Sequence, residues 1–499
     1  MTSALELFSK HRSRLLGLVA ALVIANVVLV AGAYLLYPGY LDHGEPSVAL
    51  ISWLILEGYP AFLKLDDPIM TGNVYGPLTF VIHSVSYLLL GPSVIAGKAL
   101  SVLAAAMIPV LLFMSQRHRG MDVAALGAVL GAGLVLFHVP FSIWNRPDSI
   151  IALLAIAAVW LANVSGSDRP EWVKSLAIAV MAGIAVGMKL HAGAYFAPVV
   201  IYHCLNSKRG LKTFAVMAVV GLSVVMLPFA FSVFSFANFL DWILALSEKE
   251  NPITSIPKFA RHGFIYAMPV VFYLAAWRWP GKKIGHAEKA YFWVFVVSLA
   301  LILVPATKAG AGTHYFFPFV AVLIDLILRN IGRVKIHRTI VWGMAGVLAA
   351  TIFIVGVPVQ KRFFRALHWQ ESAAVQAEIR TIMAAYPERT IEMGIGEDLK
   401  TYPRTFNRTL LVLGGHPYTV DHAPAMEITM LKIPLNDALL SMLRGCNTDI
   451  WLVPKGEKPF KMIGYYGTPT FGQAFSDTFN ASYTKTKSFK FFDVWVCSN

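Results

Sequence analysis

Long apolar blocks alternate with short polar loops through the first 360 residues of the chain. A helix that crosses a bilayer needs about 20 consecutive apolar residues, so this pattern predicts transmembrane helices. Several blocks are shorter than that and end at a polar residue, which favours a water-filled cavity there, because irregular backbone at membrane depth persists only against protein or water. The apolar segments lie at 15–37, 75–91, 92–114, 122–141, 149–164, 175–190, 192–205, 211–234, 262–278, 289–306, 315–329 and 338–358.

The charge of the loops between these segments sets the predicted topology. Basic residues gather before the first segment and in the loops Arg117–Arg119, Lys208–Lys212, Arg278–Lys289 and Arg329–Arg338. The positive-inside rule places these loops and the N-terminus in the cytoplasm, and the C-terminal region on the far side. Only one full crossing then fits between Tyr75 and Arg117, so either 75–91 or 92–114 is expected to be partial, which leaves about 11 crossings.

Two stretches do not fit the spanning pattern. Pro46–Glu57 is too short to cross and starts with proline, which predicts a helix lying in the membrane interface, with Glu45 at its N-terminus. After about residue 359 the sequence becomes polar, and Glu371–Tyr386 has a helical pattern. Strand-like runs follow at Thr409–Leu413, Ile450–Val453 and Phe491–Val496.

These patterns predict a polytopic α-helical membrane protein with two parts. Residues 1–360 form a transmembrane module whose first outer loop spans 38–75, and residues 361–499 form a small outer α/β or α+β domain. A hydrophobic content of 57%, a charged content of 14% and a mean hydropathy of +0.62 exclude an ordinary soluble protein. The net charge of +14 is spread over short groups, which does not favour nucleic-acid binding.

The polar C-terminal region also holds two of the three cysteines, Cys446 and Cys497. Outside the cytoplasm, a disulfide between them is one expectation, because oxidising compartments preserve such bonds. Two unpaired thiols are the other expectation.

Polar residues that could carry chemistry fall on the predicted outer face. The first outer loop holds Asp42 and Glu45, and later outer loops and segment ends hold Arg146, Asp148, Lys189, His191 and His314. A charged side chain at membrane depth costs roughly 2.5–3.5 kcal/mol, so a group of them facing one cavity indicates a functional site. Basic groups could hold an anionic phosphate while a carboxylate takes a proton from an attacking hydroxyl.

Each of these residues also has a structural interpretation. Asp42 and Glu45 could be solvated loop charges, and Arg146 and Asp148 could form an ion pair that caps the following helix. Lys189 could extend to the membrane interface, and His314 with Tyr315 could form an interfacial anchor. The sequence contains no zinc-ligand spacing, Walker loop or GxGxxG loop, so nucleotide-driven transport is poorly supported.

Several short motifs, taken in order, resemble the GT-C superfamily of integral-membrane glycosyltransferases. They are the acidic first loop, the interfacial helix, Tyr75-Gly-Pro-Leu78, Arg146-Pro-Asp-Ser149, Gly187-Met-Lys-Leu-His191 and Gly310-Ala-Gly-Thr-His-Tyr-Phe316. Within the superfamily, the pattern is most similar to bacterial enzymes related to the lipid A aminoarabinose transferase and to protein mannosyltransferases. The resemblance covers residues 1–360 and, more loosely, the C-terminal domain.

The resemblance implies a hexosyl- or pentosyltransferase of the bacterial inner membrane, with a cytoplasmic N-terminus and a periplasmic C-terminal domain. It would transfer a sugar from a polyprenyl-phosphate donor to a glycan, lipid or protein acceptor. Direct displacement at the anomeric carbon would invert the configuration there. The catalytic base would be Glu45 or Asp42; we favour Glu45 because it directly precedes the interfacial helix. No cofactor or divalent metal is expected.

The resemblance also implies roles for the other candidate residues. Asp148 would be a second acid that orients donor or acceptor. The donor phosphate would be bound by Arg146, Lys189, His191 and His314. Tyr75 and Tyr315 would lie near the lipid or sugar. Two other functions remain open, a transporter or flippase of lipid-linked glycans and a glycan ligase or polymerase that uses a diphosphate-linked donor.

Overall fold

A computed structural model of the chain shows two compact units, each made of segments that are far apart in the sequence. The bundle unit comprises Met1–Leu35, Ser101–Leu227 and Glu250–Arg365. The mixed unit comprises Leu36–Leu100, Pro228–Lys249 and Ala366–Asn499. The structure describes residues 2–69, 71–72, 74–163, 170–248, 259, 265–268, 270–271, 284–308, 310–331, 338–433 and 436–498.

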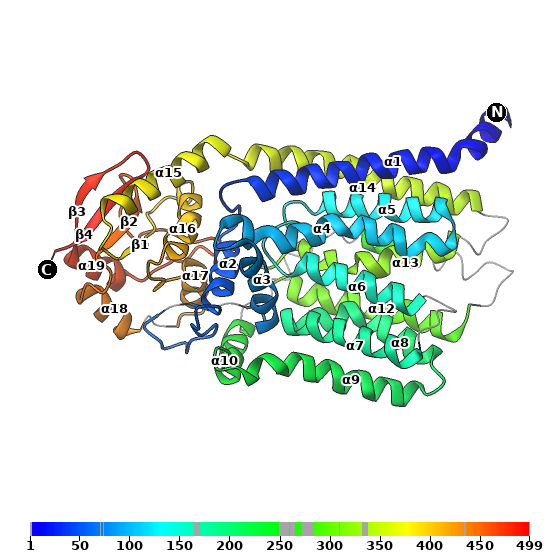
Figure 1. Ribbon diagram of the computed structural model, residues 1–499, viewed down its shortest axis with the longest axis horizontal. Helices are drawn as coiled ribbons and strands as arrows, with labels where there is room; N and C mark the ends of the chain where they lie inside the picture. Colours follow the sequence, from blue (N-terminus) through cyan, green and yellow to red (C-terminus); the bar gives the residue numbers. More distant parts are fainter. Residues whose placement is uncertain are drawn as a thin grey trace. The chain divides into compact units, whose positions relative to one another are not determined.

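Helices that run side by side form the bundle unit (Figure 1). Helix α7 packs against α6 and α9, α8 packs against α12, and α13 packs against α5 and α6. Buried apolar residues fill α5 and α13 along most of their length, so these two helices belong to the core. The helices are α1 (Thr2–Leu36), α4 (Val94–Gln116), α5 (Met121–Phe137), α6 (Asp148–Asn163), α7 (Glu171–Met188), α8 (Gly193–Asn206), α9 (Gly210–Met226), α12 (His286–Ala306), α13 (Val320–Ile331) and α14 (Arg338–Ala366).

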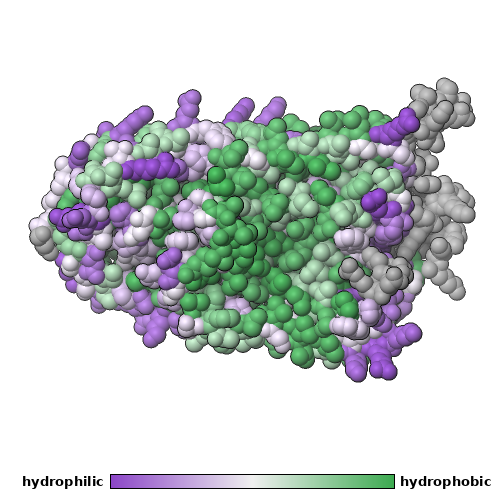
Figure 2. Space-filling model, in the orientation of Figure 1, coloured by the Kyte–Doolittle hydropathy of each residue, from purple (hydrophilic) through white to green (hydrophobic). Residues whose placement is uncertain are grey.

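The outer helices of this unit expose apolar side chains, and Figure 2 shows the resulting apolar surface in green. Examples are Leu22 of α1, Val219 of α9 and Leu301 of α12, each more than half exposed. Soluble proteins rarely expose apolar surface of this extent, whereas lipid chains cover it without cost. Six described helices are long and apolar enough to cross a membrane. They lie at Ser13–Leu36, Val94–Arg119, Glu171–Met188, Gly210–Ala230, His286–Ala306 and within Ala345–Ala385.

The predicted apolar segments correspond to helices wherever the structure describes them. Segment 75–91 forms α3 (Pro77–Leu90), whose 14 residues extend only about 21 Å, whereas α4 has 23 residues. The hydrocarbon core of a bilayer is about 30 Å thick, so these lengths favour 75–91 as the partial segment. Most of segment 262–278 lies outside the described residues, and the count of 11 crossings stays a prediction.

The mixed unit contains a four-stranded sheet in the order β1-β2-β4-β3 (Figure 1). The first pair is parallel and the other two pairs are antiparallel. Alternate residues of β2 point to opposite faces, as strand geometry requires. Leu452 packs with Ile379 of helix α15 on one face, and Trp451 packs with Phe479 of α19 on the other. The elements are α15 (Trp369–Ala385), β1 (Ile391–Met393), β2 (Ile450–Pro454), α19 (Gln473–Ser482), β3 (Tyr483–Ser488) and β4 (Phe492–Cys497).

Most sequence predictions for this region are confirmed. The helix at 371–386 corresponds to α15, and the strands at 450–453 and 491–496 correspond to β2 and β4. Cys446 and Cys497 form a disulfide, with their Cα atoms 5.9 Å apart. The predicted strand at Thr409–Leu413 is wrong, because this run forms helix α16 (Arg408–Leu413). A short apolar run has no periodicity that separates a buried strand from a helical turn.

Segments from the first 250 residues complete the mixed unit. Helix α2 (Gly44–Leu54) follows the first loop, as predicted, and Glu45 lies in its first turn. Val48 and Ile51 of α2 pack against Phe62 and Phe80, together with Phe239 of α10 (Phe236–Ser247). The remaining helices are α17 (His422–Met430) and α18 (Asp437–Arg444). Long-range packing therefore holds the first loop within the same unit as the C-terminal sheet.

Candidate functional site

The candidate residues fall into two groups, one in each unit. The loop group lies in the mixed unit around Asp42 and Glu45. The phosphate-site group lies in the bundle unit and contains Arg146, Asp148, Lys189, His191, His314 and Tyr315. Their predicted placement around one cavity stays a prediction.

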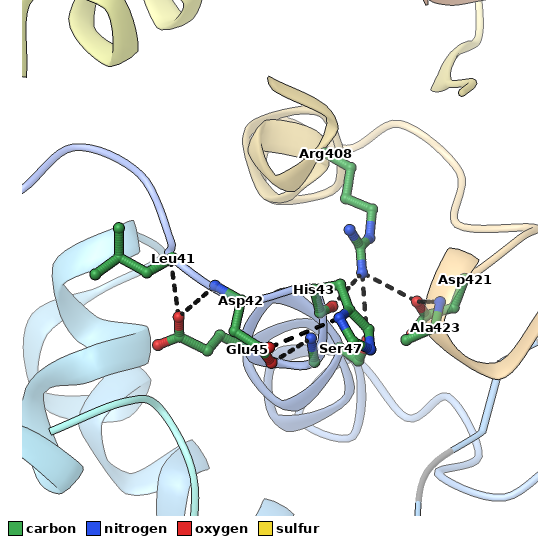
Figure 3. Close-up of polar contacts among 9 residues, drawn as sticks. Leu41, Asp42, His43, Glu45, Ser47, Arg408, Asp421 and Ala423 are labelled. Carbon is green, nitrogen blue, oxygen red and sulfur yellow. Dashed lines mark hydrogen bonds and ion pairs between the residues drawn. The ribbon is translucent and has the colours of Figure 1, made fainter. Parts of the chain in front are cut away.

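Glu45 is fully buried and faces the backbone of its own loop. Its Oε2 accepts hydrogen bonds from the backbone N–H of Leu41 at 2.9 Å and of Asp42 at 3.0 Å (Figure 3). Backbone N–H groups that surround a carboxylate stabilise its charged form. Glu45 therefore closes the turn that leads into α2.

Asp42 lies in a more open position than Glu45. Its Oδ1 accepts a hydrogen bond from the backbone N–H of Gly44 at 3.0 Å, and its Oδ2 lies 3.7 Å from Nδ1 of His43. The side chain of Asp42 keeps 16% of its exposure, compared with none for Glu45. The ring of His43 lies 5.2 Å from that of Tyr465. Of the two loop acids, Asp42 is the one that an approaching hydroxyl group can reach.

A buried lysine in the same unit was not among the predicted site residues. Lys98 lies in the first turns of α4, whose residues up to Leu100 belong to the mixed unit. It has no exposed surface and donates a hydrogen bond from Nζ to the carbonyl of Tyr37 at 2.5 Å. Its Nζ also lies 5.3 Å from the ring centroids of Tyr37 and Tyr40, and the charge of Glu45 acts on it. A lysine within the apolar segment 92–114 is a visible signal in the sequence, because such a residue is costly at membrane depth.

A charged residue from the C-terminal part of the unit, Arg408, reaches the first loop and is paired there with Asp421. Arg408 of α16 donates from Nη2 to the carbonyl of His43 at 3.1 Å and to Asp421 Oδ1 at 3.0 Å (Figure 3). Burial alone lowers the pKa of Arg408, but the carboxylate of Asp421 more than offsets this and raises it above the ordinary value. More than 360 residues of sequence separate Arg408 from His43, so no local pattern predicts this contact.

Tyr75, predicted to lie near the lipid or sugar, is a core residue of the mixed unit. It is 7% exposed and packs in the apolar cluster that includes Phe62, Phe80 and Phe239. Its predicted contact with a ligand stays a prediction.

In the bundle unit, Lys189 forms the centre of the phosphate-site group. Its Nζ donates to Asp148 Oδ1 at 2.7 Å and lies 4.3 Å from the centroid of the Tyr315 ring. Lys189 is 4% exposed and Asp148 is 1% exposed, so this lysine ends in a buried ion pair and not at an open interface. Asp148 begins α6, and Lys189 sits where α7 ends and a 3-10 turn, η2 (Leu190–Ala192), begins.

Stacked rings join the two histidines to this pair. His191 stacks on Tyr315, with centroids 4.6 Å apart and planes inclined by 19°. His314 stacks on Phe141 at 5.0 Å and lies 4.9 Å from Tyr315. His314 and Tyr315 are held by the 3-10 helix η5 (Thr313–Phe319), which packs against α6.

Three polar atoms of this group have spare capacity for a ligand. Asp148 Oδ2, His191 Nε2 and His314 Nδ1 are buried and make no hydrogen bond to any described residue. Buried polar groups are normally paired with protein, water or ligand, so their shared location indicates a binding site. Arg146 precedes them in the chain and places its guanidinium 4.7 Å from the centroid of the Trp144 ring.

The structure thus places six of the predicted residues in one unit, Arg146, Asp148, Lys189, His191, His314 and Tyr315. In the described part of the chain, no group of three or more His, Cys, Asp or Glu side chains has the arrangement to hold a metal ion. The expectation that the protein needs no metal or other cofactor stays a prediction.

Comparison with solved structures shows which fold these units form. The chain is similar to ArnT from Cupriavidus metallidurans bound to undecaprenyl phosphate, with a TM-score of 0.56 and 13% identity. The apo state of the same protein gives a TM-score of 0.51 and 14% identity, and both alignments cover 95% of this chain and 97% of that chain. By sequence, the chain matches no family model and no curated protein. The predicted resemblance to the GT-C superfamily is confirmed at the level of the fold.

Proposed function

We propose that the protein is a glycosyltransferase that moves a sugar from a polyprenyl-phosphate carrier to an acceptor on the periplasmic face of the bacterial inner membrane. The observation that carries this proposal is the buried group around Lys189, with three polar atoms available for a ligand. The shared fold supports it, because ArnT was crystallised with undecaprenyl phosphate. The N-terminus would be cytoplasmic, and the C-terminal domain would be periplasmic.

The phosphate-site group supplies the positive charge that the leaving group needs. Lys189 and Arg146 are cationic, and His191 and His314 add ring N–H donors. Donors fixed in a buried site stabilise charge that develops on phosphate oxygens without having to reorganise. Asp148 holds Lys189 in place, and its free Oδ2 could accept a hydrogen bond from a sugar hydroxyl.

Asp42 is the general base in this mechanism. Its carboxylate takes the proton of an acceptor hydroxyl as the acceptor oxygen forms a bond to the anomeric carbon of the donor. The bond from that carbon to the phosphate oxygen breaks, and the polyprenyl phosphate leaves with the bonding electrons. A single displacement of this kind inverts the configuration at the anomeric carbon.

We propose Asp42 as the base in place of Glu45, the residue favoured in the sequence analysis, and two observations support this choice. A general base needs an oxygen within hydrogen-bond reach of the acceptor hydroxyl, whereas Glu45 is fully buried and its Oε2 accepts two backbone N–H groups. Asp42 keeps some exposure, and its Oδ1 accepts the hydrogen bond from the backbone N–H of Gly44. Glu45 then serves to shape the loop that presents Asp42.

Reconstitution tests this function against the two alternatives. Purified protein in lipid vesicles is supplied with a polyprenyl-monophosphate sugar and a panel of glycan, lipid and peptide acceptors. Transfer of the sugar, with release of polyprenyl phosphate, is the expected result. Movement of the intact donor across the bilayer without transfer would favour a transporter, and consumption of only a diphosphate-linked donor would favour a ligase or polymerase.

A further inference from the structure

A buried ion pair between two residues of the C-terminal region contacts the first loop. Arg408 is 2% exposed and Asp421 is fully buried, and their side chains meet at 3.0 Å. The same Nη2 of Arg408 also reaches the carbonyl of His43 at 3.1 Å and the hydroxyl of Ser47 at 3.3 Å. Figure 3 shows the guanidinium pointing from α16 toward the start of α2.

Asp421 is itself fixed by the fold. Its Oδ1 accepts a hydrogen bond from the backbone N–H of Ala423 at 3.1 Å and so caps the N-terminus of α17. The pair therefore ties two C-terminal helices, α16 and α17, to the loop. A well-packed apolar pair would commonly stabilise a core equally well or better, so the buried charges indicate a role beyond stability.

The contact point on the loop lies next to the proposed base. His43 follows Asp42 directly, and its carbonyl is held by Arg408 while its ring lies near Tyr465. On the other side, the N–H of Asp42 is held by Glu45. The peptide group between His43 and Gly44 is thus held at its carbonyl by Arg408, and its N–H donates to Oδ1 of Asp42. Fixing this peptide group and the N–H of Asp42 restricts the direction in which the Asp42 carboxylate points.

We infer that Arg408 and Asp421 form a clamp through which the C-terminal part of the chain positions Asp42 for catalysis. They are positioning residues, because they act through the His43 peptide group and not on the substrate. The inference rests on the proposed function for its catalytic consequence. Displacing a catalytic group by about 1 Å commonly lowers a rate about 100-fold.

The decisive variant is the double substitution Arg408→Met with Asp421→Leu. It replaces the ion pair by apolar side chains of similar size, which removes the bond to His43 and leaves no buried charge without a partner. We expect a folded protein whose kcat for sugar transfer falls about 100-fold while KM for the donor stays within about twofold. The single variant Arg408→Lys keeps Asp421 and one cationic donor, so its kcat should lie between those of the double variant and the wild type.

The matched control is Arg404→Ala, four residues away. Arg404 pairs with Glu371 at 3.0 Å in a more exposed setting, and among the described residues it makes no hydrogen bond or ion pair with the loop. This variant should keep the wild-type rate. A double variant that also keeps the wild-type rate would overturn the clamp and leave a purely structural ion pair.

Hydrogen exchange of the loop gives a second readout that does not need activity. The amides of Leu41, Asp42 and Gly44 are hydrogen-bonded within the loop, so loosening should raise their exchange rates. We expect faster exchange over residues 41–47 in the double variant and no change in Arg404→Ala. Unchanged exchange in the double variant would contradict the clamp, even if the wild-type protein transferred no sugar and the proposed function itself failed.

Discussion

The two groups of candidate residues are built in different ways. In the loop group, backbone N–H and carbonyl groups hold the side chains, and most of these contacts span only a few residues. In the phosphate-site group, side chains hold one another through an ion pair and stacked rings drawn from three separate regions of sequence. The loop group therefore depends on the course of the chain, whereas the phosphate-site group depends on how the helices pack.

This difference predicts how each group responds to substitution. Removing one member of the phosphate-site group should disturb its neighbours strongly, because they are buried and have few other partners. Removing a side chain from the loop group should change the direction of one carboxylate with less effect on the remaining fold.

The largest expected effect is that of Lys189→Met. This change leaves the carboxylate of Asp148 buried without its cation, which costs about 3–5 kcal/mol of unfolding free energy. Adding Asp148→Leu should recover most of the stability but not donor binding. Thermal unfolding in detergent and binding of polyprenyl phosphate separate the two effects. If the single variant were as stable as the wild type, the ion pair would not be what holds this group together.

The next effect is the pH dependence of stability that comes from Glu392 of β1, a buried acid outside both groups. Burial raises the pKa of Glu392 to about 7, although hydrogen bonds from Thr419 and Thr448 oppose the rise. The folded state then binds the proton more tightly than the unfolded state, whose pKa is near 4.5. The contribution of Glu392 to the free energy of unfolding should therefore be fully present below about pH 4.5. It should fall by about 3 kcal/mol as the pH rises to about 7.

Glu392→Gln should remove this dependence. The free energy of unfolding, measured from pH 5 to 8, checks the prediction. In a pH–rate profile, a change that disappears in this variant comes from the stability of the sheet, and a change that remains comes from the base. A fall in stability of equal size in the variant would exclude Glu392 as its source.

The smallest expected effect is that of Tyr315. Its ring stacks on His191 and lies 4.3 Å from Lys189 Nζ, and both contacts need an aromatic face. Tyr315→Phe should keep most donor affinity, whereas Tyr315→Leu should weaken donor binding by about 0.5–2 kcal/mol, the value of a cation–π contact. Equal affinities in the two variants would show that the ring does not support Lys189.

The sequence predicts the helices of the bundle unit well because each is an apolar run of distinctive length. The phosphate-site residues are predicted because charged and polar residues at the ends of such runs are costly there and stand out. The arrangement of His191, Tyr315 and His314 as stacked rings could not be read from the sequence, since it depends on the packing of η5 against α6.

The mixed unit was predicted less completely. The run Thr409–Leu413 is predicted as a strand but forms helix α16, and no sequence pattern distinguishes Arg408 at the start of this helix. The choice between Asp42 and Glu45 also depends on contacts that spacing does not specify, namely which carboxylate turns back onto the loop N–H groups. Lys98 stands out in the sequence as a charge within an apolar run, but the sequence does not indicate that Tyr37 and Tyr40 are its partners.

The most direct test of the account is the rate of sugar transfer by Asp42→Asn and Glu45→Gln, measured side by side in the reconstituted system. Asp66→Asn serves as the control, because Asp66 is an exposed acid of the same loop. Loss of a general base commonly lowers a rate by about 100- to 10,000-fold, so Asp42→Asn should fall by that amount. Glu45→Gln can still accept the two backbone hydrogen bonds and should stay within about tenfold of the wild type. An active Asp42→Asn together with an inactive Glu45→Gln would contradict the assignment and make Glu45 the base.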